Sequence, residues 1–284
     1  KDFLFYKYCK ELPMLIGTGM CKTKENIFLL LVIKSLAENA DRRAAVRSTW
    51  GRETVIGGRR VHRVFLLGQT QAKIRSKKLQ ALIQEESEVH GDIIQWAFRE
   101  SFFNVTLKEY LLWKWFTEEC HTVSFVFKGD DDVYVNVANI IQFLSDYNPN
   151  ENLYAGDVFI NTYAVRLKWS KYYIPLLMYG NKPYPPYIGG GGYLLSRQSI
   201  KLLQHAFQKI DIFPIDDAYV GMCAEAVGIK VMSHAGFRTH GQIPYDPCIY
   251  KELILVHKVL PNELYLIWSL IKHSTEKCSR IAKA

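Results

Sequence analysis

The feature that most constrains the fold is an alternation between short apolar runs and segments with helical periodicity, which fills residues 27–145. The run 27–35 is strongly apolar, as expected of a strand that is covered on both faces. The predicted strands are 27–35, 61–67, 92–96 and 122–128, and the predicted helices are 41–50, capped by Asp41, 71–90 and 105–120. Strands that alternate with helices form a mostly parallel sheet with crossover helices. The sequence therefore predicts an α/β fold with a mixed, mostly parallel central sheet flanked by helices.

The pattern loosens after Asn148 into an aromatic, proline-containing stretch that ends in four consecutive glycines, 189–192. A strand over 193–195 and a helix over 197–210 are expected next, and a further helix opens at Asp216. Four glycines leave the backbone bare of side chains, as is needed where a ligand approaches closely. They match neither a P-loop nor a GxGxxG fingerprint, which disfavours an ATPase or a dehydrogenase.

Composition favours one globular domain with a small anionic ligand. The chain has 284 residues, 49% hydrophobic and 23% charged, without a linker or low-complexity tract. Its net charge of +8 comes from Lys and Arg scattered among acids, unlike the basic blocks of a nucleic-acid-binding arm. No apolar run approaches the roughly 20 residues that span a bilayer, so we expect any membrane segment to lie outside this chain, which begins at Lys1.

Six cysteines and one glycosylation acceptor favour a secretory lumen. The cysteines are widely spaced and form no CxxC pair, which argues against structural zinc and permits three disulfides in any of 15 pairings. Asn104-Val105-Thr106 is an N-glycosylation acceptor sequence.

Two acidic groups are the candidates for chemistry. Asp130, Asp131 and Asp132 directly follow a predicted strand, at the edge of the sheet where open α/β proteins bind ligands. Adjacent carboxylates repel one another, so they form either a solvated turn or a site for Mg²⁺ or Mn²⁺ that shares its coordination with phosphates. Asp216 and Asp217 open a helix and serve either as caps or as a general base for an attacking hydroxyl.

Five motifs stand in an order that resembles a known family. They are RRAAVRSTWG (42–51), VFLLG (64–68), FKGDDDVYVN (127–136), YPPY (184–187) with the glycine run, and IDDAYVGMC (215–223). Together they resemble the Golgi β-1,3-glycosyltransferases, over about residues 27–278. The likeness is strongest to the β-1,3-N-acetylglucosaminyltransferases, because of the uninterrupted glycines and the Pro-Ile-Asp-Asp before the helix. Residues 169–173 and 245–248 are similar to members that extend mucin core 1 glycans, and poly-N-acetyllactosamine members are close alternatives.

This resemblance implies a GT-A fold. Residues 1–26 would be the end of a stem region, and 27–284 the catalytic domain. Within that domain, 27–145 would bind the nucleotide sugar and 146–284 the acceptor. The whole enzyme would be a type II Golgi membrane protein whose anchor is absent from this chain, with its catalytic part in the lumen. The oligomeric state stays open, a homodimer included.

The resemblance also implies a donor site. The acids 130–132 would form a DxD motif in which Asp132, helped by Asp130 and His257, holds Mn²⁺, with Mg²⁺ as an alternative. The donor-side contacts would come from a set of backbone and side-chain groups: Lys34, Ser35, Arg43, Arg47, Asp130, Asp131, Gly190 and Gly191. Read without the family, Arg43 and Arg47 are equally consistent with solvated charges on one helix face, and His257 with an ordinary surface histidine.

On the acceptor side, Asp217 would be the catalytic base and Asp216 would position it. Tyr184 and Tyr187 would form an aromatic platform for acceptor sugars, although core packing explains them equally well. Asn104 would carry a glycan, and Cys223–Cys248 is the pairing that the resemblance favours.

The implied function is an inverting transfer of GlcNAc from UDP-GlcNAc in β-1,3 linkage onto terminal galactose of a glycoprotein or glycolipid glycan. The alternatives are a β-1,3-galactosyltransferase that uses UDP-galactose and a catalytically inactive carbohydrate-binding relative. A glycosidase would also use two carboxylates but would need neither nucleotide nor metal. No nucleic-acid partner is expected.

Overall fold

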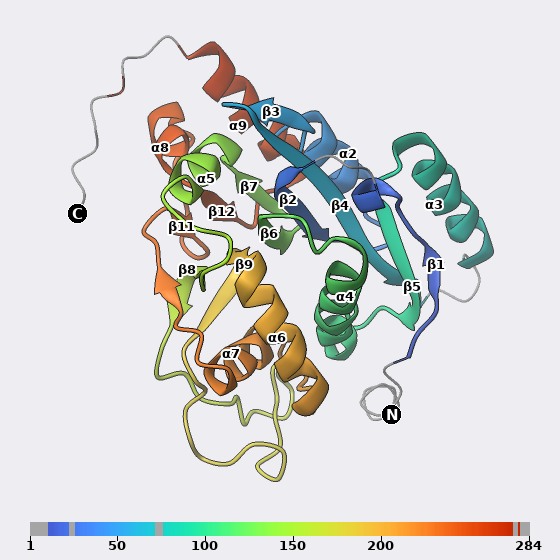
Figure 1. Cartoon of the computed structure of the whole chain (residues 1–284), viewed down its shortest axis with the longest axis vertical. Helices are drawn as coiled ribbons and strands as arrows, with labels where there is room; N and C mark the ends of the chain where they lie inside the picture. Colours follow the sequence, from blue (N-terminus) through green and yellow to red (C-terminus); the bar gives the residue numbers. More distant parts are fainter. Residues whose placement is uncertain (1–10, 23–25, 72–75, 275–277, 279–284) are drawn as a thin grey trace.

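The structure, a computed structural model, describes residues 11–22, 26–71, 76–274 and 278. Within them a nine-stranded mixed sheet runs through the molecule, with helices on both faces (Figure 1). Its strand order is β1 (Met14–Ile16), β5 (Ile93–Arg99), β4 (Arg59–Gln69), β2 (Ile27–Lys34), β6 (Phe125–Asp130), β9 (Tyr187–Ser196), β8 (Tyr154–Phe159) and β10 (Met232–Ser233), with β3 (Thr54–Ile56) beside β4. The predicted α/β class is confirmed.

Parallel pairing is concentrated where the sequence alternates between strand and helix. Strands β5, β4, β2 and β6 are parallel neighbours, whereas β9 adds antiparallel to β6, and β8 antiparallel to β9. A second, three-stranded sheet joins β11 (Phe237–Arg238), β12 (Leu255–His257) and β7 (Val133–Val135). The registers bring Lys34 opposite Asp130, and His257 opposite Val133. The sheets thus gather groups from four parts of the chain at the end of β6.

Apolar side chains on the two faces of the central sheet form two separate cores. Alternate residues of β2 and β4 enter opposite cores: Leu30 and Leu66 lie in one, Leu31 and Phe65 in the other. Burial on both faces explains why these strands read as continuous apolar runs. The first core includes helices α4 (Val105–Glu119), α6 (Arg197–Lys209) and α7 (Asp216–Ala226). The second includes α2 (Ala40–Ser48), α3 (Ser76–His90), α5 (Val137–Leu144), α8 (Pro247–Glu252) and α9 (Pro261–His273).

Two local predictions need correction. Helix α2 begins at Ala40 with Asn39 in the N-cap position, so Asp41 lies in the first turn and is not the cap. The strand expected over 193–195 is the end of β9, which also contains all four glycines. Glycine has low strand propensity, but here the glycines stand where an added Cβ would collide with neighbouring side chains.

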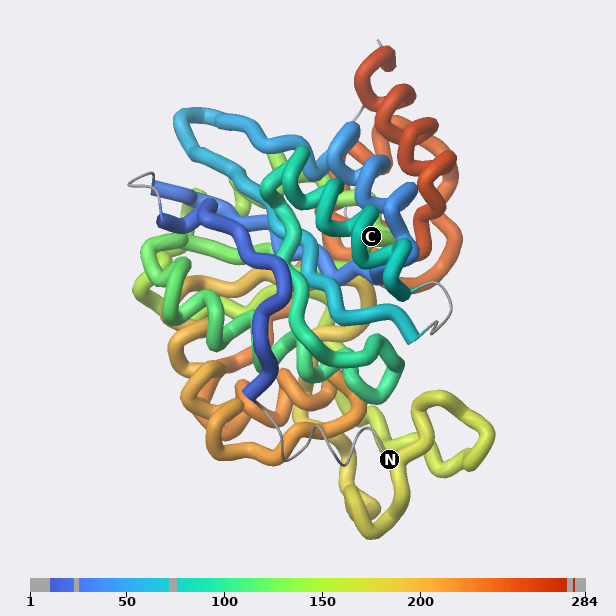
Figure 2. The backbone as a smooth tube through the Cα atoms, turned by 90° about the vertical axis from the view of Figure 1, so that its right-hand side faces the viewer, coloured from blue at the N-terminus to red at the C-terminus, as the bar shows by residue number. Residues whose placement is uncertain are grey.

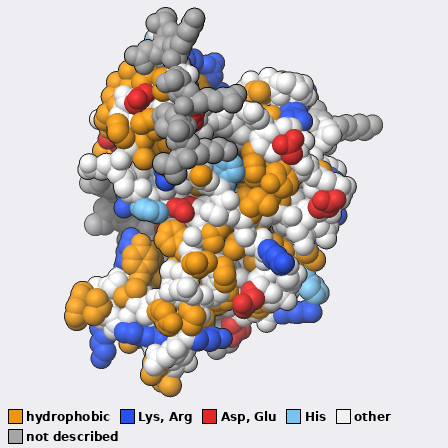
Figure 3. Space-filling model, turned by 90° about the vertical axis from the view of Figure 1, so that its left-hand side faces the viewer, with side chains coloured by type: hydrophobic (Ala, Val, Ile, Leu, Met, Phe, Trp, Pro, Cys, Tyr) orange, Lys and Arg blue, Asp and Glu red, His pale blue; other side chains and the backbone are white. Residues whose placement is uncertain are grey.

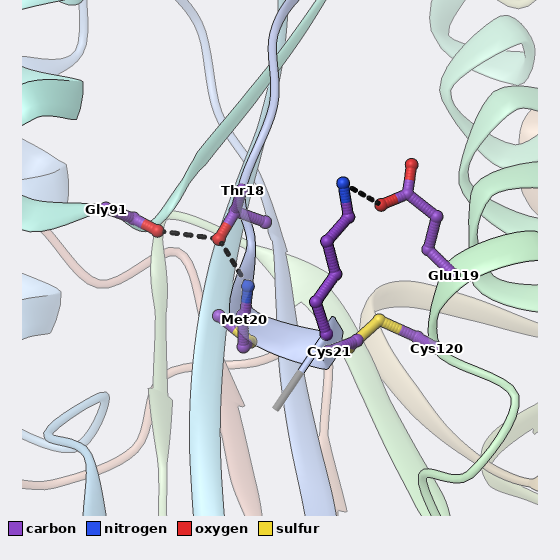
Figure 4. Close-up of a disulfide and its surroundings, with 7 residues drawn as sticks. Thr18, Met20, Cys21, Gly91, Glu119 and Cys120 are labelled. Atoms are coloured by element: carbon purple, nitrogen blue, oxygen red, sulfur yellow. Dashed lines mark hydrogen bonds and ion pairs between the residues drawn. A yellow bond between two sulfur atoms is a disulfide. The ribbon is translucent and has the colours of Figure 1, made fainter. Parts of the chain in front are cut away.

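Two disulfides join described residues, Cys21–Cys120 and Cys248–Cys278. The first ties the 3-10 turn η1 (Met20–Lys22) to the end of α4, beside an ion pair between Lys22 and Glu119 (Figure 4). The predicted Cys223–Cys248 pair is wrong. Cys223 is a buried thiol in α7, on one face of the sheet, whereas Cys248 lies in α8 on the other. A disulfide requires α-carbons within about 7 Å, which those positions exclude.

The chain path is compact except near the lower end, where residues 160–186 project beyond the helices (Figures 1 and 2). Within the described part of the chain, no helix is long and apolar enough to cross a bilayer.

Candidate active site

A cavity of about 860 Å³ opens at the carboxyl ends of β2 and β6. This is the edge at which open α/β sheets bind ligands. Nine of the residues singled out from the sequence line it: Lys34, Ser35, Asp130, Asp131, Asp132, Gly190, Asp216, Asp217 and His257. Groups as far apart in the chain as Lys34 and His257 therefore face one space.

Cationic neighbours explain how three consecutive acids are tolerated. The Nζ atom of Lys34 lies 3.0 Å from Asp130, and Arg42 lies 3.3 Å from Asp131 and 3.4 Å from Asp132. Asp131 is buried and also accepts hydrogen bonds from Ser35 (2.6 Å) and from Asn39. Asp131 thereby holds the end of β2 and the start of α2 together, while Asp130 and Asp132 face the cavity.

Asp130, Asp132 and His257 form a group that fits a divalent cation. One ligand atom from each lies within 4.8 Å of the others, and His257 Nε2 is 3.4 Å from Asp132 Oδ1. Two carboxylates and an imidazole are donors that suit Mn²⁺, and carboxylates also suit Mg²⁺. Pairing of β12 with β7 carries His257 into place. The three residues predicted as metal ligands are thus brought together.

The glycine run makes room for this histidine. Gly191 has a φ of +80°, and a Cβ built there would lie 3.0 Å from His257 Cγ. Gly190 also has a positive φ, and its amide donates a 3.1 Å hydrogen bond to Asp217 Oδ2. Gly190 and Gly191 therefore link the base candidate to the group that fits a metal, and whether a donor sugar contacts their backbone stays a prediction.

Asp216 and Asp217 are adjacent, but their pKa values are shifted in opposite directions. Although burial disfavours its charge, Asp216 lies 2.8 Å from Lys34 and 3.8 Å from Lys128, and these lysines hold its pKa well below the usual range. Burial, reinforced by the charge of Asp216, raises the pKa of Asp217 to about 7. A carboxylate with such a pKa can accept a proton from a hydroxyl near neutral pH.

Two buried lysines that were not predicted complete the charge arrangement. Lys128 of β6 contacts Glu109 of α4, which also accepts a 2.9 Å hydrogen bond from Tyr193. Lys108 lines the cavity, pairs with Glu100 at 2.8 Å and donates to the Ser35 carbonyl. The sequence could have indicated this network, because residues 108–109 and 128 are charged positions inside largely apolar segments. Fully buried charges require partners, so such positions indicate an internal ion network.

Arg43 and Arg47 do not reach the cavity, contrary to the prediction of nucleotide contact. Arg43 is fully buried, with its guanidinium on Glu86 and on the Leu36 carbonyl. Arg47 binds Asp92 at 2.8 Å and Glu86 at 2.7 Å. The two arginines therefore form ion pairs that fasten α2 to α3 and to Asp92, the residue before β5.

Of the two tyrosines predicted to contact acceptor sugars, only Tyr187 has an exposed surface. Tyr184 is buried among aromatic rings that include Phe213, and burial raises its pKa to about 12. It packs in the core and presents no face to a sugar, so that prediction is wrong. Tyr187 is partly exposed, and its ring stacks on that of Phe159 with centroids 5.7 Å apart. Burial, together with the charge of Asp217, raises the pKa of its hydroxyl. A role for Tyr187 toward the acceptor stays a prediction.

Asn104, the predicted glycosylation site, is buried. Only 1% of this residue is exposed, and its Nδ2 atom, to which a glycan would be attached, donates to the Arg99 carbonyl. Thr106 of the same acceptor sequence is buried as well and bonds to the Phe213 carbonyl. Both polar side chains of the acceptor sequence thus contribute to the start of α4, and glycosylation of Asn104 stays a prediction that this burial disfavours.

The fold and the site together define an α/β protein with an acidic, ligand-sized cavity at the carboxyl ends of its strands. Comparison with known proteins makes this specific. Residues 41–235 match the galactosyltransferase family, and the chain belongs to this family. The resemblance drawn from the sequence motifs is confirmed.

Several relatives align along nearly the whole chain. N-acetyllactosaminide β-1,3-N-acetylglucosaminyltransferase 3 of Homo sapiens is 42% identical over 285 residues, which cover 98% of this chain and 77% of that protein. UDP-GlcNAc:βGal β-1,3-N-acetylglucosaminyltransferase 7 of Mus musculus is 43% identical over 98% of this chain and 72% of its own length. The acetylgalactosaminyl-O-glycosyl-glycoprotein β-1,3-N-acetylglucosaminyltransferase of Homo sapiens is 39% identical over 99% of this chain and 76% of its own length. All three names specify transfer of N-acetylglucosamine.

Proposed function

We propose that this chain is a metal-dependent, inverting β-1,3-N-acetylglucosaminyltransferase that moves GlcNAc from UDP-GlcNAc onto terminal galactose of a glycan. The observation that carries the proposal is the placement of Asp217, a partly buried carboxylate with a pKa of about 7, in the same cavity as Asp130, Asp132 and His257. The donor and linkage are supported by the names of relatives that align with almost the entire chain.

The reaction is one displacement. The acceptor hydroxyl oxygen forms a bond to the anomeric carbon of GlcNAc, the bond from that carbon to the diphosphate breaks, and the electron pair leaves with UDP. The hydroxyl proton passes to Asp217. Attack from the face opposite the leaving group inverts the anomeric configuration. Removing the proton as the bond forms raises the nucleophilicity of the oxygen, which contributes roughly 10²–10⁴-fold to such reactions.

Residues around the base hold it in the reactive form and orientation. The Gly190 amide fixes one oxygen of Asp217, and Lys34 and Lys128 hold Asp216 charged beside it. Asp216 positions its neighbour and tunes the pKa of Asp217, rather than competing for the proton. Asp130, Asp132 and His257 would hold Mn²⁺ or Mg²⁺, which supplies Lewis-acid stabilisation of the leaving diphosphate.

We further propose that residues 27–145 bind the donor and 146–284 the acceptor, and that the enzyme works in the Golgi lumen. The two disulfides support an oxidising compartment. The acceptor is a galactose-terminated glycan of the N-acetyllactosamine or core 1 type.

The test is sugar transfer by the purified chain. UDP-GlcNAc and UDP-galactose are offered in parallel with N-acetyllactosamine and core 1 disaccharide, with Mn²⁺ or with EDTA. We expect transfer of GlcNAc that EDTA abolishes, and a β-1,3 linkage by NMR of the product. Transfer of galactose alone would refute the donor assignment, and undiminished transfer in EDTA would refute the metal.

A further inference from the structure

The segment 160–183 exposes more apolar surface than a solvated loop normally does. Ile160, Tyr163 and Leu167 are each more than half exposed, Trp169 is 84% exposed, and Leu177 is fully exposed beside Leu176. The segment is the projection at the lower end of the molecule in Figure 2. Soluble proteins rarely display so many large apolar side chains in one place without a binding partner.

The exposed side chains belong to a segment that is held in shape by its own hydrogen bonds. Val165 and Tyr173 form a β-bridge, and the Ile174 amide donates to the Val165 carbonyl. Arg166 clamps the base of the segment by donating to the carbonyls of Ile174, Tyr179 and Gly180. Two turns result, one carrying Trp169 and one carrying Leu177, and both present their apolar side chains outward.

The charge of the segment has a single sign. It contains Arg166, Lys168, Lys171 and Lys182 and no acidic residue, in a chain where Asp and Glu number 28. Lys168 and Lys182 are exposed, next to the apolar turns. Figure 3 shows the result, with hydrophobic side chains lying between Lys and Arg side chains at the lower end of the view. An anionic surface complements this arrangement.

We propose that residues 160–183 dock the enzyme on an anionic lipid surface. Trp and Leu at the turn tips insert among the headgroups, and the lysines bind the lipid phosphates and carboxylates. Interfacial segments combine these same elements: aromatic and aliphatic side chains at one level and Lys or Arg at the headgroup level. A protein partner would not require the uniform positive charge.

Docking here would place the cavity next to the bilayer, since Lys171 and Tyr172 of this segment line it. If the proposed function holds, acceptors carried close to the membrane are favoured. Lipid binding itself does not depend on the transfer reaction, so a binding assay can fail or succeed independently of it.

The experiment is cosedimentation of the purified chain with vesicles of phosphatidylcholine alone or mixed with phosphatidylserine. We expect the chain to bind the mixed vesicles, because each basic residue near an anionic surface typically contributes roughly 1 kcal/mol of binding free energy, about fivefold in partitioning. Added salt should weaken this binding because it screens the charges. Lys168→Ala with Lys182→Ala should weaken binding by roughly 25-fold, about fivefold for each lysine, and Leu176→Glu with Leu177→Glu should weaken it on the order of tenfold or more.

A matched control is Leu82→Glu with Val89→Glu, two residues that are 51% and 72% exposed. They belong to α3, a helix that lies far from the projection (Figure 1). This variant should bind vesicles like the wild type. Brominated lipids should quench emission of Trp169, and Trp169→Phe should remove that quenching. Absence of binding to mixed vesicles, or equal loss in the α3 control, would overturn the proposal.

Discussion

Replacing Asp217 by Asn isolates the chemical step. The amide oxygen of Asn can still accept the hydrogen bond from Gly190, so the local structure should be kept. What is lost is the base, and we expect turnover to fall about 10²–10⁴-fold, a barrier increase of about 3–5 kcal/mol. Removing one of two adjacent, partly buried carboxylates also relieves repulsion, so the stability of the variant should not fall.

The assay is the initial rate of GlcNAc transfer at saturating donor and at pH 8. With a pKa of about 7, about nine-tenths of Asp217 is deprotonated at that pH, so the full effect is visible. UDP affinity, measured by calorimetry, should stay within about twofold, because no donor contact is removed. The companion Asp217→Ala leaves the Gly190 amide without its acceptor and should cost a further 1–3 kcal/mol in stability, by order of magnitude. If the rate of Asp217→Asn stayed within roughly threefold of the wild-type rate, the assignment of Asp217 as the base would be refuted.

Three further outcomes are expected. Because the deprotonated form of Asp217 is the active one and its pKa is raised to about 7, kcat/KM should fall as pH drops from 8 to 6, by about tenfold; a flat pH profile would contradict this. His257→Ala should raise the Mn²⁺ concentration needed for half activity by about tenfold or more, measured by titrating metal into the EDTA-treated enzyme, and an unchanged midpoint would remove His257 from the metal group. Cys120→Ser opens a bond spanning 99 residues and should lower the free energy of unfolding by about 2–5 kcal/mol in denaturant titrations, without changing the pH profile of transfer.

The location of Asp130 was predictable because it follows a predicted strand, whereas Lys34 was singled out through the family resemblance. Lys34 ends β2 and Asp130 ends β6, and because parallel neighbours bring their carboxyl ends to one edge of the sheet, the two side chains lie together. His257 was found through the family motif, since β12 reaches β7 by a pairing that no local pattern announces.

The errors share a different cause. Residue type indicates what a side chain could do but does not identify its partner. Arg43 would suit a phosphate, yet Glu86 on the next helix satisfies it, and Tyr184 would suit a sugar, yet it packs on Phe213. Cys223 was misread for the same reason, because its pairing depends on which face of the sheet its helix covers.

The pKa values of Asp216 and Asp217 differ because the two nearby lysines contact Asp216 directly. Lys128 joins Glu109 to Asp216, and Lys34 joins Asp216 to Asp130, so that charges alternate along the series. Burial and the charge of Asp216 raise the pKa of Asp217, and the charges of Lys34 and Lys128 lower it. Two substitutions should therefore move the acid limb of the pH profile in opposite directions.

Asp216→Asn removes the like charge beside Asp217 and should shift the limb to lower pH, whereas Lys34→Met removes a cation and should shift it to higher pH. Both changes alter the same buried contact, the 2.8 Å pair of Lys34 with Asp216, so a loss of packing would affect them alike. Opposite shifts in kcat/KM profiles, measured at saturating Mn²⁺, would establish that electrostatics at Asp217 sets the working pH. Shifts of the same sign would mean that the titrating group is another residue.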